Sequence, residues 1–403
     1  MNPVVIIGNC ISSVSAAEAF RKHDKDTPII IFSDEPYYAY YRMRLSNLIG
    51  DTPNLDKLYI RKPEWYSNNN IEVHLDQKVI SIDTEKRSVS IENGNTVFFS
   101  KLLIASGSSA FVPPVPGRNL PGVFSIRSLD DIKRFNDFIV NKSQCAVIGG
   151  GLLGLETAWS LAKKGKKVYV VEGSNHLLYK QVDEAAAALL ADLGKKANIS
   201  FINQGRLNEI LGDKEVTDIK LGDGQTIPVE FVVFATGVRP NIDLVKNTSI
   251  QAARGIVVDE YMQTSVKDIY AAGDIAEYNG QVYGIWPVAI EQGKTAGLNM
   301  AEQKTPYSEV IPSNYLKVFD VEIFSVGDLC KDGSPHTSIK SISKEDNIYR
   351  VVFFKDSIPV GAILFGDTKP ATKISKAIKS GVKISDKVID SEDFEGFLNE
   401  ISV

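Results

Sequence analysis

The amino-acid sequence predicts an α/β fold built on two similar units, followed by a C-terminal α+β segment. An apolar run that ends in glycine occurs twice, at residues 3–8 (PVVIIG) and 144–149 (QCAVIG), and a helical pattern follows each run. A second apolar run then follows, at Ile29–Phe32 and at Val168–Val171, with an acidic residue at its end. Strand, glycine turn, helix and strand is the pattern of a parallel βαβ unit.

Composition sets the first limits on function. The chain has 403 residues, enough for two or three domains at roughly 150 residues each. Its net charge of −5 provides no general attraction to nucleic acid or to anionic membranes. The sequence has no stretch of about 18 apolar residues, so it predicts no transmembrane helix. The N-terminus lacks the positively charged region of a secretory signal. We therefore expect a cytoplasmic protein.

Cysteine and histidine spacing argues against metal and disulfide chemistry. The three cysteines are Cys10, Cys145 and Cys330, and no two share a short motif. This spacing excludes a local CxxC redox pair, a zinc ribbon and a cysteine-ligated iron–sulfur cluster. The four histidines are far apart and show no metal-ligand spacing. We expect no metal site.

Further apolar runs and proline-rich segments predict the domain organisation. The runs Lys101–Ala105, Phe231–Ala235 and Asp268–Ala271 end in small residues, which suits parallel strands whose carboxyl ends meet a ligand. The segments Phe111–Gly122 and Lys304–Pro312 have the composition of domain crossings. We expect a discontinuous first domain (1–110 and 236–304), a second domain inserted into it (111–235) and a C-terminal α+β domain (305–403).

The second unit carries the clearer nucleotide motif. Gly149, Gly151 and Gly154 form GxGxxG, in which the glycines permit a tight turn, close approach to a pyrophosphate and close helix packing. The helix that begins near Leu152 offers free N–H groups to the phosphates. Glu172 ends the next strand, where a carboxylate accepts hydrogen bonds from the adenosine ribose and repels a 2′-phosphate. The pattern predicts NADH rather than NADPH.

The first unit departs from this fingerprint. Gly8 is present, but Cys10 and Ser13 occupy the second and third glycine positions. The side chain of Cys10 stands where backbone is expected to approach a pyrophosphate. A plain βαβ unit that binds nothing remains an alternative at this point.

Six motifs in combination resemble one enzyme family: GNCISSVSAAEA, SDEPYYAYYRMRLS, LLIASGS, GGGLLGLE, ATGVRPN and DIYAAGDIAE. They resemble the flavoprotein reductases with two dinucleotide-binding domains that are related to glutathione reductase. The chain is most similar to the NADH:rubredoxin oxidoreductase branch and to the flavoprotein part of assimilatory nitrite reductases. The resemblance covers nearly the whole chain and implies two Rossmann-like domains, a discontinuous FAD-binding domain (1–110 and 236–304) and an NAD-binding domain (111–235).

The resemblance also implies residue roles. Glu35 would bind the FAD ribose, Asp274 the ribityl chain, and the helix that begins near Pro287 would point its N-terminus at the flavin. The full set implied for FAD is Gly8, Cys10, Ser13, Glu35, Arg42, Val79, Ala105, Gly107, Arg127, Asp274 and Val288. For NAD it is Gly149, Gly151, Leu152, Gly154, Glu156, Glu172 and Gly237. Glu156 would bind the nicotinamide amide and is the expected catalytic residue, although a surface helix glutamate is the plainer interpretation.

The missing thiols limit the electron acceptor. Related disulfide reductases and peroxidases use cysteines near the first βαβ unit, but residues 37–50 (YYAYYRMRLSNLIG) contain none. Electrons are then expected to leave a flavin directly, for rubredoxin or a similar small one-electron carrier. An NADH oxidase or diaphorase that uses oxygen or a quinone is the alternative enzyme. A degenerate flavoprotein that binds NADH as a sensor is the alternative that Cys10 and Ser13 suggest.

One C-terminal segment predicts a protein partner. Residues 367–381 predict a helix with Asp367 or Thr368 as its cap, Pro370 in the first turn and Gly381 at its end. Four lysines share one face of it, Lys369, Lys373, Lys376 and Lys379, while apolar residues share the other. This basic face could steer an acidic carrier, although a merely solvated face is the plainer alternative.

Overall fold

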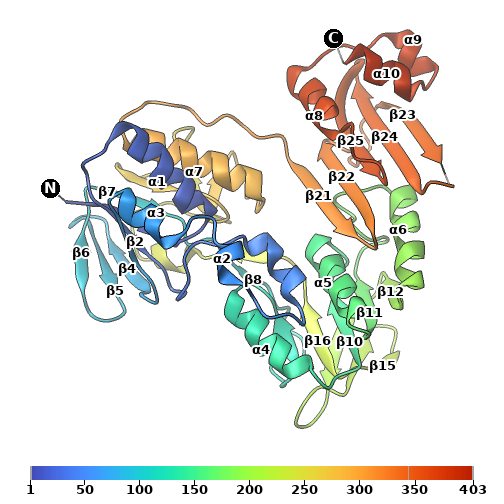
Figure 1. Cartoon of the computed structure of the whole chain (residues 1–403), viewed down its shortest axis with the longest axis horizontal. Coiled ribbons are helices and arrows are strands. Elements are labelled where there is room, and N and C mark those ends of the chain that lie inside the picture. Colours follow the sequence, from blue (N-terminus) through green and yellow to red (C-terminus); the bar gives the residue numbers. More distant parts are fainter. Residues whose placement is uncertain (1, 344, 402–403) are drawn as a thin grey trace. The chain divides into compact units, whose positions relative to one another are not determined.

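A computed structural model of the chain describes residues 2–343 and 345–401 (Figure 1). The chain divides into two compact units, each assembled from three segments. Unit 1 contains residues 1–44, 52–110 and 237–310, and unit 2 contains residues 45–51, 111–236 and 311–403.

Unit 1 is built on a five-stranded parallel sheet with the order β19-β7-β1-β2-β3. These strands are β1 (Val4–Ile7), β2 (Ile29–Phe32), β3 (Ile71–His74), β7 (Lys101–Ile104) and β19 (Ile269–Ala271). The main helices are α1 (Ile11–His23) and α7 (Trp286–Met300), which lie side by side in Figure 1. The first βαβ unit predicted from the sequence is therefore confirmed as β1, α1 and β2.

Smaller elements complete unit 1. A hairpin sheet contains β4 (Val79–Asp83), β5 (Ser88–Ile91) and β6 (Thr96–Phe98). Two two-stranded pairs are formed by β8 (Ser108–Ala110) with β17 (Val238–Pro240), and by β18 (Ile256–Val258) with β20 (Ala276–Tyr278). The short helices are α2 (Leu55–Leu58), α3 (Pro63–Asn68) and the 3₁₀ turn η2 (Ile242–Val245). The residues of another 3₁₀ turn, η1 (Arg42–Leu48), are divided between unit 1 (up to Arg44) and unit 2 (from Leu45).

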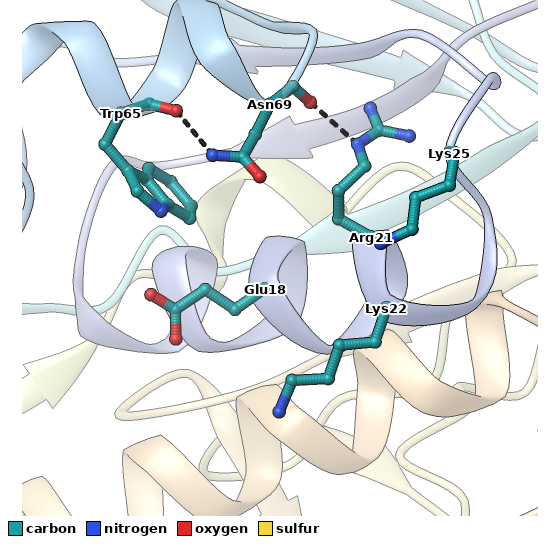
Figure 2. A pocket seen from close by; sticks show the side chains of 6 residues that line it. All are labelled: Glu18, Arg21, Lys22, Lys25, Trp65 and Asn69. Atoms are coloured by element: carbon teal, nitrogen blue, oxygen red, sulfur yellow. Dashed lines mark hydrogen bonds between the residues drawn. The ribbon is translucent and has the colours of Figure 1, made fainter.

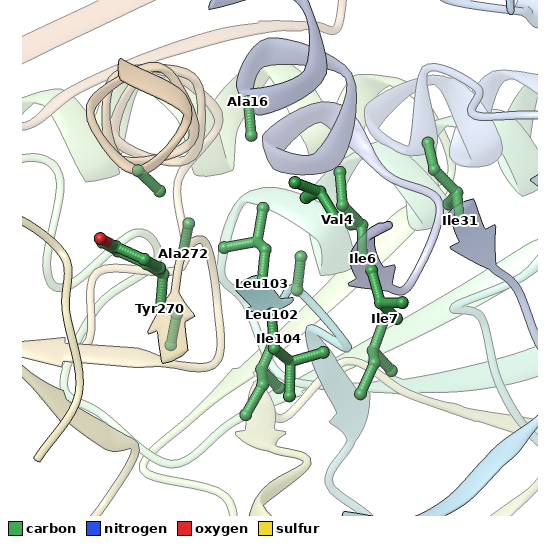
Figure 3. Packing of buried hydrophobic residues seen from close by; sticks show 14 of the residues in the cluster. Val4, Ile6, Ile7, Ala16, Ile31, Leu102, Leu103, Ile104, Tyr270 and Ala272 are labelled. Atoms are coloured by element: carbon green, nitrogen blue, oxygen red, sulfur yellow. The ribbon is translucent and has the colours of Figure 1, made fainter. Parts of the chain in front are cut away.

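The core of unit 1 explains why α1 and α7 are rich in small residues. Figure 3 shows Ala16 of α1 pointing toward the sheet that carries Val4 and Leu103. A Cβ added at Gly293 would meet the backbone oxygen of Ser12 at 2.3 Å, and one at Gly297 would meet that of Ala16 at 2.2 Å. The backbones of α1 and α7 can approach this closely only because α7 has glycine at both positions.

Unit 2 repeats this architecture in the order β12-β11-β10-β16-β9, again parallel throughout. Its strands are β9 (Val123–Ser125), β10 (Gln144–Ile148), β11 (Lys167–Glu172), β12 (Ile199–Asn203) and β16 (Phe231–Phe234). The helices are α4 (Leu129–Ile139), α5 (Leu152–Lys163) and α6 (Glu184–Lys196), and a small antiparallel sheet contains β13 (Leu207–Leu211), β14 (Asp218–Leu221) and β15 (Thr226–Pro228). The second predicted βαβ unit is confirmed as β10, α5 and β11.

The C-terminal part of unit 2 is an antiparallel sheet covered by helices. Its order is β21-β22-β25-β24-β23, with β21 (Ser313–Val318), β22 (Val321–Gly327), β23 (Thr337–Ser343), β24 (Ile348–Lys355) and β25 (Ile358–Phe365). Three short helices follow, α8 (Ala371–Ser380), α9 (Asp386–Asp390) and α10 (Phe394–Glu400), and Figure 1 shows them gathered beside this sheet. Phe394 and Phe397 of α10 join its core.

The predicted cap of the lysine-rich helix is wrong. The N-cap is Pro370, and neither Asp367 nor Thr368 caps α8. Both side chains are used elsewhere: Asp367 pairs with Arg350, and the hydroxyl of Thr368 donates to Glu322 at 2.9 Å. The predicted end is confirmed, because Gly381 is the C-cap in the left-handed conformation with φ of 64°.

Candidate functional site

The glycine turn of unit 2 has a separate physical reason for each glycine. Gly149 follows β10 with φ of +113°, and a Cβ there would lie 2.5 Å from the carbonyl oxygen of Ala235. A Cβ at Gly151, the N-cap of α5, would meet nothing within 4 Å. A Cβ at Gly154 would lie 1.9 Å from the oxygen of Gly149. These are the tight turn, the open approach and the close packing that a dinucleotide turn requires.

A carboxylate faces this turn from the next strand. Glu172, the last residue of β11, accepts hydrogen bonds from the backbone N–H of Gly150 at 2.6 Å and of Ser174 at 2.7 Å. Each carboxylate oxygen accepts one of these bonds and keeps a further lone pair. The helix α5 begins at Leu152 without a side-chain cap among the described residues, which leaves its first N–H groups to a ligand or to water. The geometry suits a ribose and a phosphate.

Glu156 lies one turn into α5 and has a partner that sequence reasoning missed. The hydroxyl of Ser46 donates to Glu156 Oε2 at 2.9 Å. Burial raises the pKa of Glu156, and the hydrogen bond from Ser46 opposes that rise. The plainer interpretation of a solvated helix glutamate therefore does not describe its environment. No motif could reveal Ser46, because 110 residues separate it from Glu156.

The segment that carries Ser46 is fastened to unit 2 at several points. Asn136 of α4 donates to the backbone oxygen of Leu48 at 2.9 Å, and Lys164 pairs with Asp51 at 2.7 Å. Residues 45–51 thereby belong to unit 2, although Arg44 and the residues before it belong to unit 1. The position of Ser46 is fixed by these contacts and not by the local sequence.

In unit 1 the first glycine turn is closed in a different way. Gly8 follows β1 with φ of +96°, and a Cβ there would lie 2.3 Å from the oxygen of Ala105, the residue after β7. Ser13, fully buried, donates its hydroxyl to the oxygen of Gly8 at 2.5 Å. A hydrogen bond thus replaces the close packing that a third glycine would permit.

Cys10 fits its position without backbone strain. It is the N-cap of α1 with φ of −139°, an extended conformation that any residue adopts. Its Sγ lies 3.2 Å from the hydroxyl of Ser12 and 3.4 Å from the oxygen of Ala105. The thiol is therefore engaged by protein atoms.

Buried polar atoms without a protein partner occur at the same strand ends. Asn9 Nδ2 and Ser106 Oγ are buried and have no hydrogen-bond partner among the described residues. They follow β1 and β7, two neighbouring strands of the sheet. Buried polar groups are normally paired, so these two fit a polar ligand at the carboxyl edge of the sheet.

Three charged residues implied for FAD, Glu35, Arg42 and Asp274, have hydrogen-bond partners within unit 1. Glu35 accepts from Arg42 at 2.6 Å and from the phenol of Tyr40 at 2.7 Å. Burial alone lowers the pKa of Arg42, but Tyr40 and Glu35 beside it raise that pKa above its ordinary value. Asp274 accepts from the hydroxyl of Ser108 at 2.7 Å. Sequence reasoning assigned no role to Tyr40 or Ser108, although both lie inside the quoted motifs.

The other four residues implied for FAD lie at a strand start, before a strand and at two helix starts. Val79 begins β4 and is buried, Gly107 precedes β8 with φ of +66°, and Val288 is buried in the first turn of α7. α7 has Pro287 in its first turn, as predicted, and no side-chain cap among the described residues. Arg127 precedes α4 and belongs to unit 2, unlike the other residues implied for FAD.

Gly237, implied for NAD, belongs to unit 1, with φ of +92° and open space at its Cβ position. The other residues implied for NAD belong to unit 2. The structure therefore assigns Arg127 and Gly237 to the opposite unit from the rest of their sets.

A shallow depression elsewhere in unit 1 has a structural explanation. Figure 2 shows the side chains that line it, Glu18, Arg21, Lys22, Lys25, Trp65 and Asn69. The guanidinium of Arg21 donates to four backbone oxygens, those of Asn69, Asp24, Thr27 and Asn70. The space of about 210 Å³ is below the usual size of a cofactor pocket. We assign Arg21 the role of fastening these loops.

The described residues contain no group of three or more histidine, cysteine or acidic side chains placed to hold a metal ion. Cys10, Cys145 and Cys330 are all unpaired thiols, and burial raises the pKa of the latter two. No helix in the described part of the chain has the length and apolar character needed to cross a membrane.

Comparison with known proteins agrees with this geometry. The chain is 34% identical over 377 residues to an NADH-rubredoxin oxidoreductase of Clostridium acetobutylicum, and the match covers 94% of each chain. The solved structure of NADH:rubredoxin oxidoreductase from the same organism superposes with a TM-score of 0.82 at 33% identity, over 99% of both chains.

A longer relative matches as well. The chain is 34% identical over 385 residues to a nitrite reductase [NAD(P)H] of Bacillus subtilis, which covers 95% of this chain and 48% of that protein. The chain thus spans about half the length of this relative. Residues 312–382 match the rubredoxin NAD+ reductase C-terminal domain, and residues 2–293 match the family model of the pyridine nucleotide-disulphide oxidoreductases. The resemblance expected from the motifs is confirmed, and the chain belongs to the pyridine nucleotide-disulphide oxidoreductase family.

Proposed function

We propose that the chain is an FAD-dependent oxidoreductase that passes electrons from NADH to rubredoxin or a similar small one-electron carrier. The observation that carries the proposal is the repeated site. In two parallel sheets of the same strand order, a glycine turn with positive φ follows the first strand, and a carboxylate lies at the end of the next strand (Glu172) or just after it (Glu35). The relative from Clostridium acetobutylicum, matched over nearly its full length, bears this activity in its name. Two dinucleotide sites are what such a reaction needs.

We assign NADH to the turn of unit 2. The free lone pairs of Glu172 would accept the adenosine ribose hydroxyls, and its charge would repel a 2′-phosphate. The three residues after it, Gly173, Ser174 and Asn175, offer no cation to bind that phosphate. Glu156, held by Ser46, would accept a hydrogen bond from the nicotinamide amide, and Gly237 would let that end of NADH pass close to backbone.

We assign FAD to unit 1. Asn9, Ser106 and Gly8 would hold the pyrophosphate end, Glu35 and Arg42 the ribose, and Asp274 the ribityl chain. Val79 would meet the adenine through its backbone, and the N-terminus of α7 at Val288 would face the flavin. When bound, FAD would accept a hydride from NADH and release its two electrons singly. One NADH and two oxidised carriers then give NAD+, one proton and two reduced carriers.

The same proposal assigns the domains. Residues 1–110 and 236–304 form the FAD-binding domain, 111–235 the NAD-binding domain and 305–403 the C-terminal domain. We further propose that Arg127 contacts the flavin.

We propose that the basic face of α8 steers the carrier. Lys369, Lys373, Lys376 and Lys379 are all exposed, whereas Ile374 and Ala377 of the opposite face are buried. The start of α8 is fastened because Arg350 pairs with Asp367. A row of exposed cations on a fixed helix attracts an acidic protein mainly by raising the association rate.

Charge reversal tests this steering. The double variant Lys373→Glu/Lys376→Glu should raise the KM for rubredoxin by about five- to ten-fold at low salt, because opposing charges slow encounter. The rate with ferricyanide, a small acceptor, should not change. Lys340→Glu is the control, because Lys340 is an exposed lysine on β23 in the same domain. An equal effect of the control and of the double variant would contradict steering by α8.

The rate with rubredoxin tests the function itself. The holoprotein should reduce rubredoxin with NADH far faster than free FAD does, and faster than it consumes oxygen. A rate no greater than that of free FAD would overturn the proposal. A higher rate with oxygen or a quinone would favour the alternative of an NADH oxidase or diaphorase, and a protein that binds NADH but no FAD would favour a sensor.

A further inference from the structure

The loop between β11 and α6, residues 173–183, is tied to the glycine turn on its inner side. The backbone N–H of Leu178 donates to the oxygen of Gly150 at 2.9 Å, and that of Ser174 donates to Glu172 at 2.7 Å. Leu178 itself has φ of +50°, a left-handed conformation that a branched side chain adopts only when its surroundings hold it there. The conformation of the residues beside the Glu172 carboxylate therefore depends on the contacts that hold this loop.

The outer side of the same loop is held by the C-terminal domain. The ammonium of Lys331 donates to the backbone oxygen of Val182 at 2.6 Å and to that of Tyr179. It also lies 5.0 Å from the centre of the Tyr179 ring, within the range of a cation–π contact. Lys331 lies in the turn after β22, about 150 residues further along the chain than the loop it binds.

A second anchor holds the end of the loop. The phenol of Tyr349, on β24, donates to the carboxylate of Asp183. That carboxylate also accepts the N–H of Ala186 at 3.0 Å and so caps α6. Tyr349 is only 2% exposed, so its hydroxyl has no alternative partner in bulk water. Losing the phenol would leave Asp183 with less to fix its orientation.

Aromatic packing keeps the two anchors in place. Phe319, in the turn between β21 and β22, meets Trp159 of α5 and Phe201 of β12, with ring centres 5.4 Å and 6.4 Å apart. Gly194 of α6 leaves room for this, since a Cβ there would lie 3.1 Å from the Phe319 ring. The C-terminal sheet is therefore fixed on the helix that begins at the glycine turn.

We propose that Lys331 and Tyr349 are positioning residues for NADH: through the 173–183 loop, the C-terminal domain holds the adenosine end of the NADH site in its binding conformation. This inference rests on the proposed NADH site at Gly149–Gly154. Loss of the contacts on the outer side of the loop lowers the fraction of molecules in which residues 173–183 adopt the binding conformation. The apparent affinity for NADH then falls by the same factor. The nicotinamide end lies elsewhere, so turnover at saturating NADH is preserved.

The test measures binding of ADP-ribose, which carries only the adenosine end, to the FAD-loaded full-length protein by calorimetry. Tyr349→Phe and Lys331→Met should each raise its Kd by about three- to ten-fold, the usual effect of losing one or two polar contacts. With ferricyanide as acceptor, the KM for NADH should rise by the same factor while kcat and flavin content stay constant. Lys331→Arg keeps the charge and the donors and should recover most of the affinity.

Matched controls lie in the same domain. Tyr315→Phe removes a phenol from β21 whose hydrogen-bond partner is Glu322, and Lys340→Met removes an exposed ammonium from β23. Equal affinities in the test and control variants would overturn the inference. A fall in affinity accompanied by loss of flavin or of kcat would also overturn it, as general destabilisation. If Tyr349→Phe fails to fold, Lys331→Met, at the surface, gives the answer.

Failure of the proposed function is distinguishable. It would appear in the unaltered protein as a rate with rubredoxin no greater than that of free FAD, whereas failure of this inference would appear only as equal ADP-ribose affinities in the test and control variants.

Discussion

At the scale of single residues, the two glycine turns do the same structural task with different chemistry. In unit 2 the third glycine has no side chain because the oxygen of Gly149 occupies the Cβ position of Gly154. In unit 1 the equivalent residue, Ser13, turns its hydroxyl into a donor to Gly8. A sequence departure that suggests a lost site is thus accommodated by a hydrogen bond.

Two glycine substitutions separate folding from binding. Gly154→Ala places a Cβ 1.9 Å from a backbone oxygen, so it should lower the free energy of unfolding by about 1–3 kcal/mol through overpacking. Gly151→Ala meets open space in the protein and should leave thermal unfolding nearly unchanged while raising the Kd for NADH about ten-fold or more, because the methyl group occupies the approach of the pyrophosphate. Denaturant titration and NADH binding measure the two effects. Equal stability losses would contradict this distinction.

Glu156 gives a prediction about pH. Burial raises its pKa in the folded protein, so its contribution to stability is fully present at low pH and is lost as pH rises through the folded pKa. Gln does not ionise. The melting temperature of Glu156→Gln relative to the unaltered protein should therefore increase between about pH 4 and pH 8, by a few degrees. Thermal unfolding at several pH values measures it, and a difference independent of pH would contradict the account.

The same residue shows where sequence reasoning reaches its limit. The turn glycines and Glu172 are recognisable in the sequence because they lie at fixed short spacings around strand ends, whereas the roles of Glu35 and Asp274 are implied by the family resemblance. Ser46 could not be found in either way, since its contact with Glu156 depends on a segment that leaves unit 1 and packs on unit 2. Asn9 and Ser106 stand next to recognisable residues, but only burial without a partner reveals them.

At the scale of elements, the pairing of α1 with α7 holds the first turn in place. Two glycines of α7 face the backbone of α1, and the N–H of Gly273 donates to Gln292 of α7 at 2.9 Å. Gly273 precedes Asp274, so α7 is joined both to the turn at α1 and to the strand end that bears the aspartate. Separating these helices should disturb both at once.

Gly297→Ala tests this coupling. Its Cβ would lie 2.2 Å from the oxygen of Ala16, and forcing the helices apart should cost about 1–3 kcal/mol of stability and reduce bound FAD. Lys294→Ala on the exposed side of α7 is the control and should retain its flavin. Flavin absorbance per protein after dialysis measures the outcome. Full flavin content in Gly297→Ala would show that α1 and α7 do not set the FAD site.

Element boundaries are predictable from the sequence where hydrophobic periodicity is strong and less predictable at helix caps. Both βαβ units and the end of α8 at Gly381 agree with the structure. The start of α8 does not, because Asp367 and Thr368 have competing partners in Arg350 and Glu322. Such partners come from distant strands and leave no local signal in the sequence.

At the scale of the whole molecule, the chain passes from one unit to the other more than once. Unit 1 is assembled from three segments, and so is unit 2. The proline-rich crossings are visible in the sequence, but the transfer of residues 45–51 from one unit to the other is not, since that segment has no distinctive composition. The fold class is predictable because the two sheets repeat one sequence motif. Which chain segments belong to which unit is not predictable in the same way, because it depends on tertiary packing.

The central claim is that one chain carries electrons from NADH through FAD to rubredoxin. Anaerobic titration of the FAD-loaded protein with NADH, followed by addition of oxidised rubredoxin, tests it most directly. We predict that the flavin absorbance bleaches at one NADH per flavin and returns when two equivalents of rubredoxin are added. Flavin that does not bleach, or that bleaches and recovers its absorbance only when oxygen is admitted, would contradict the claim.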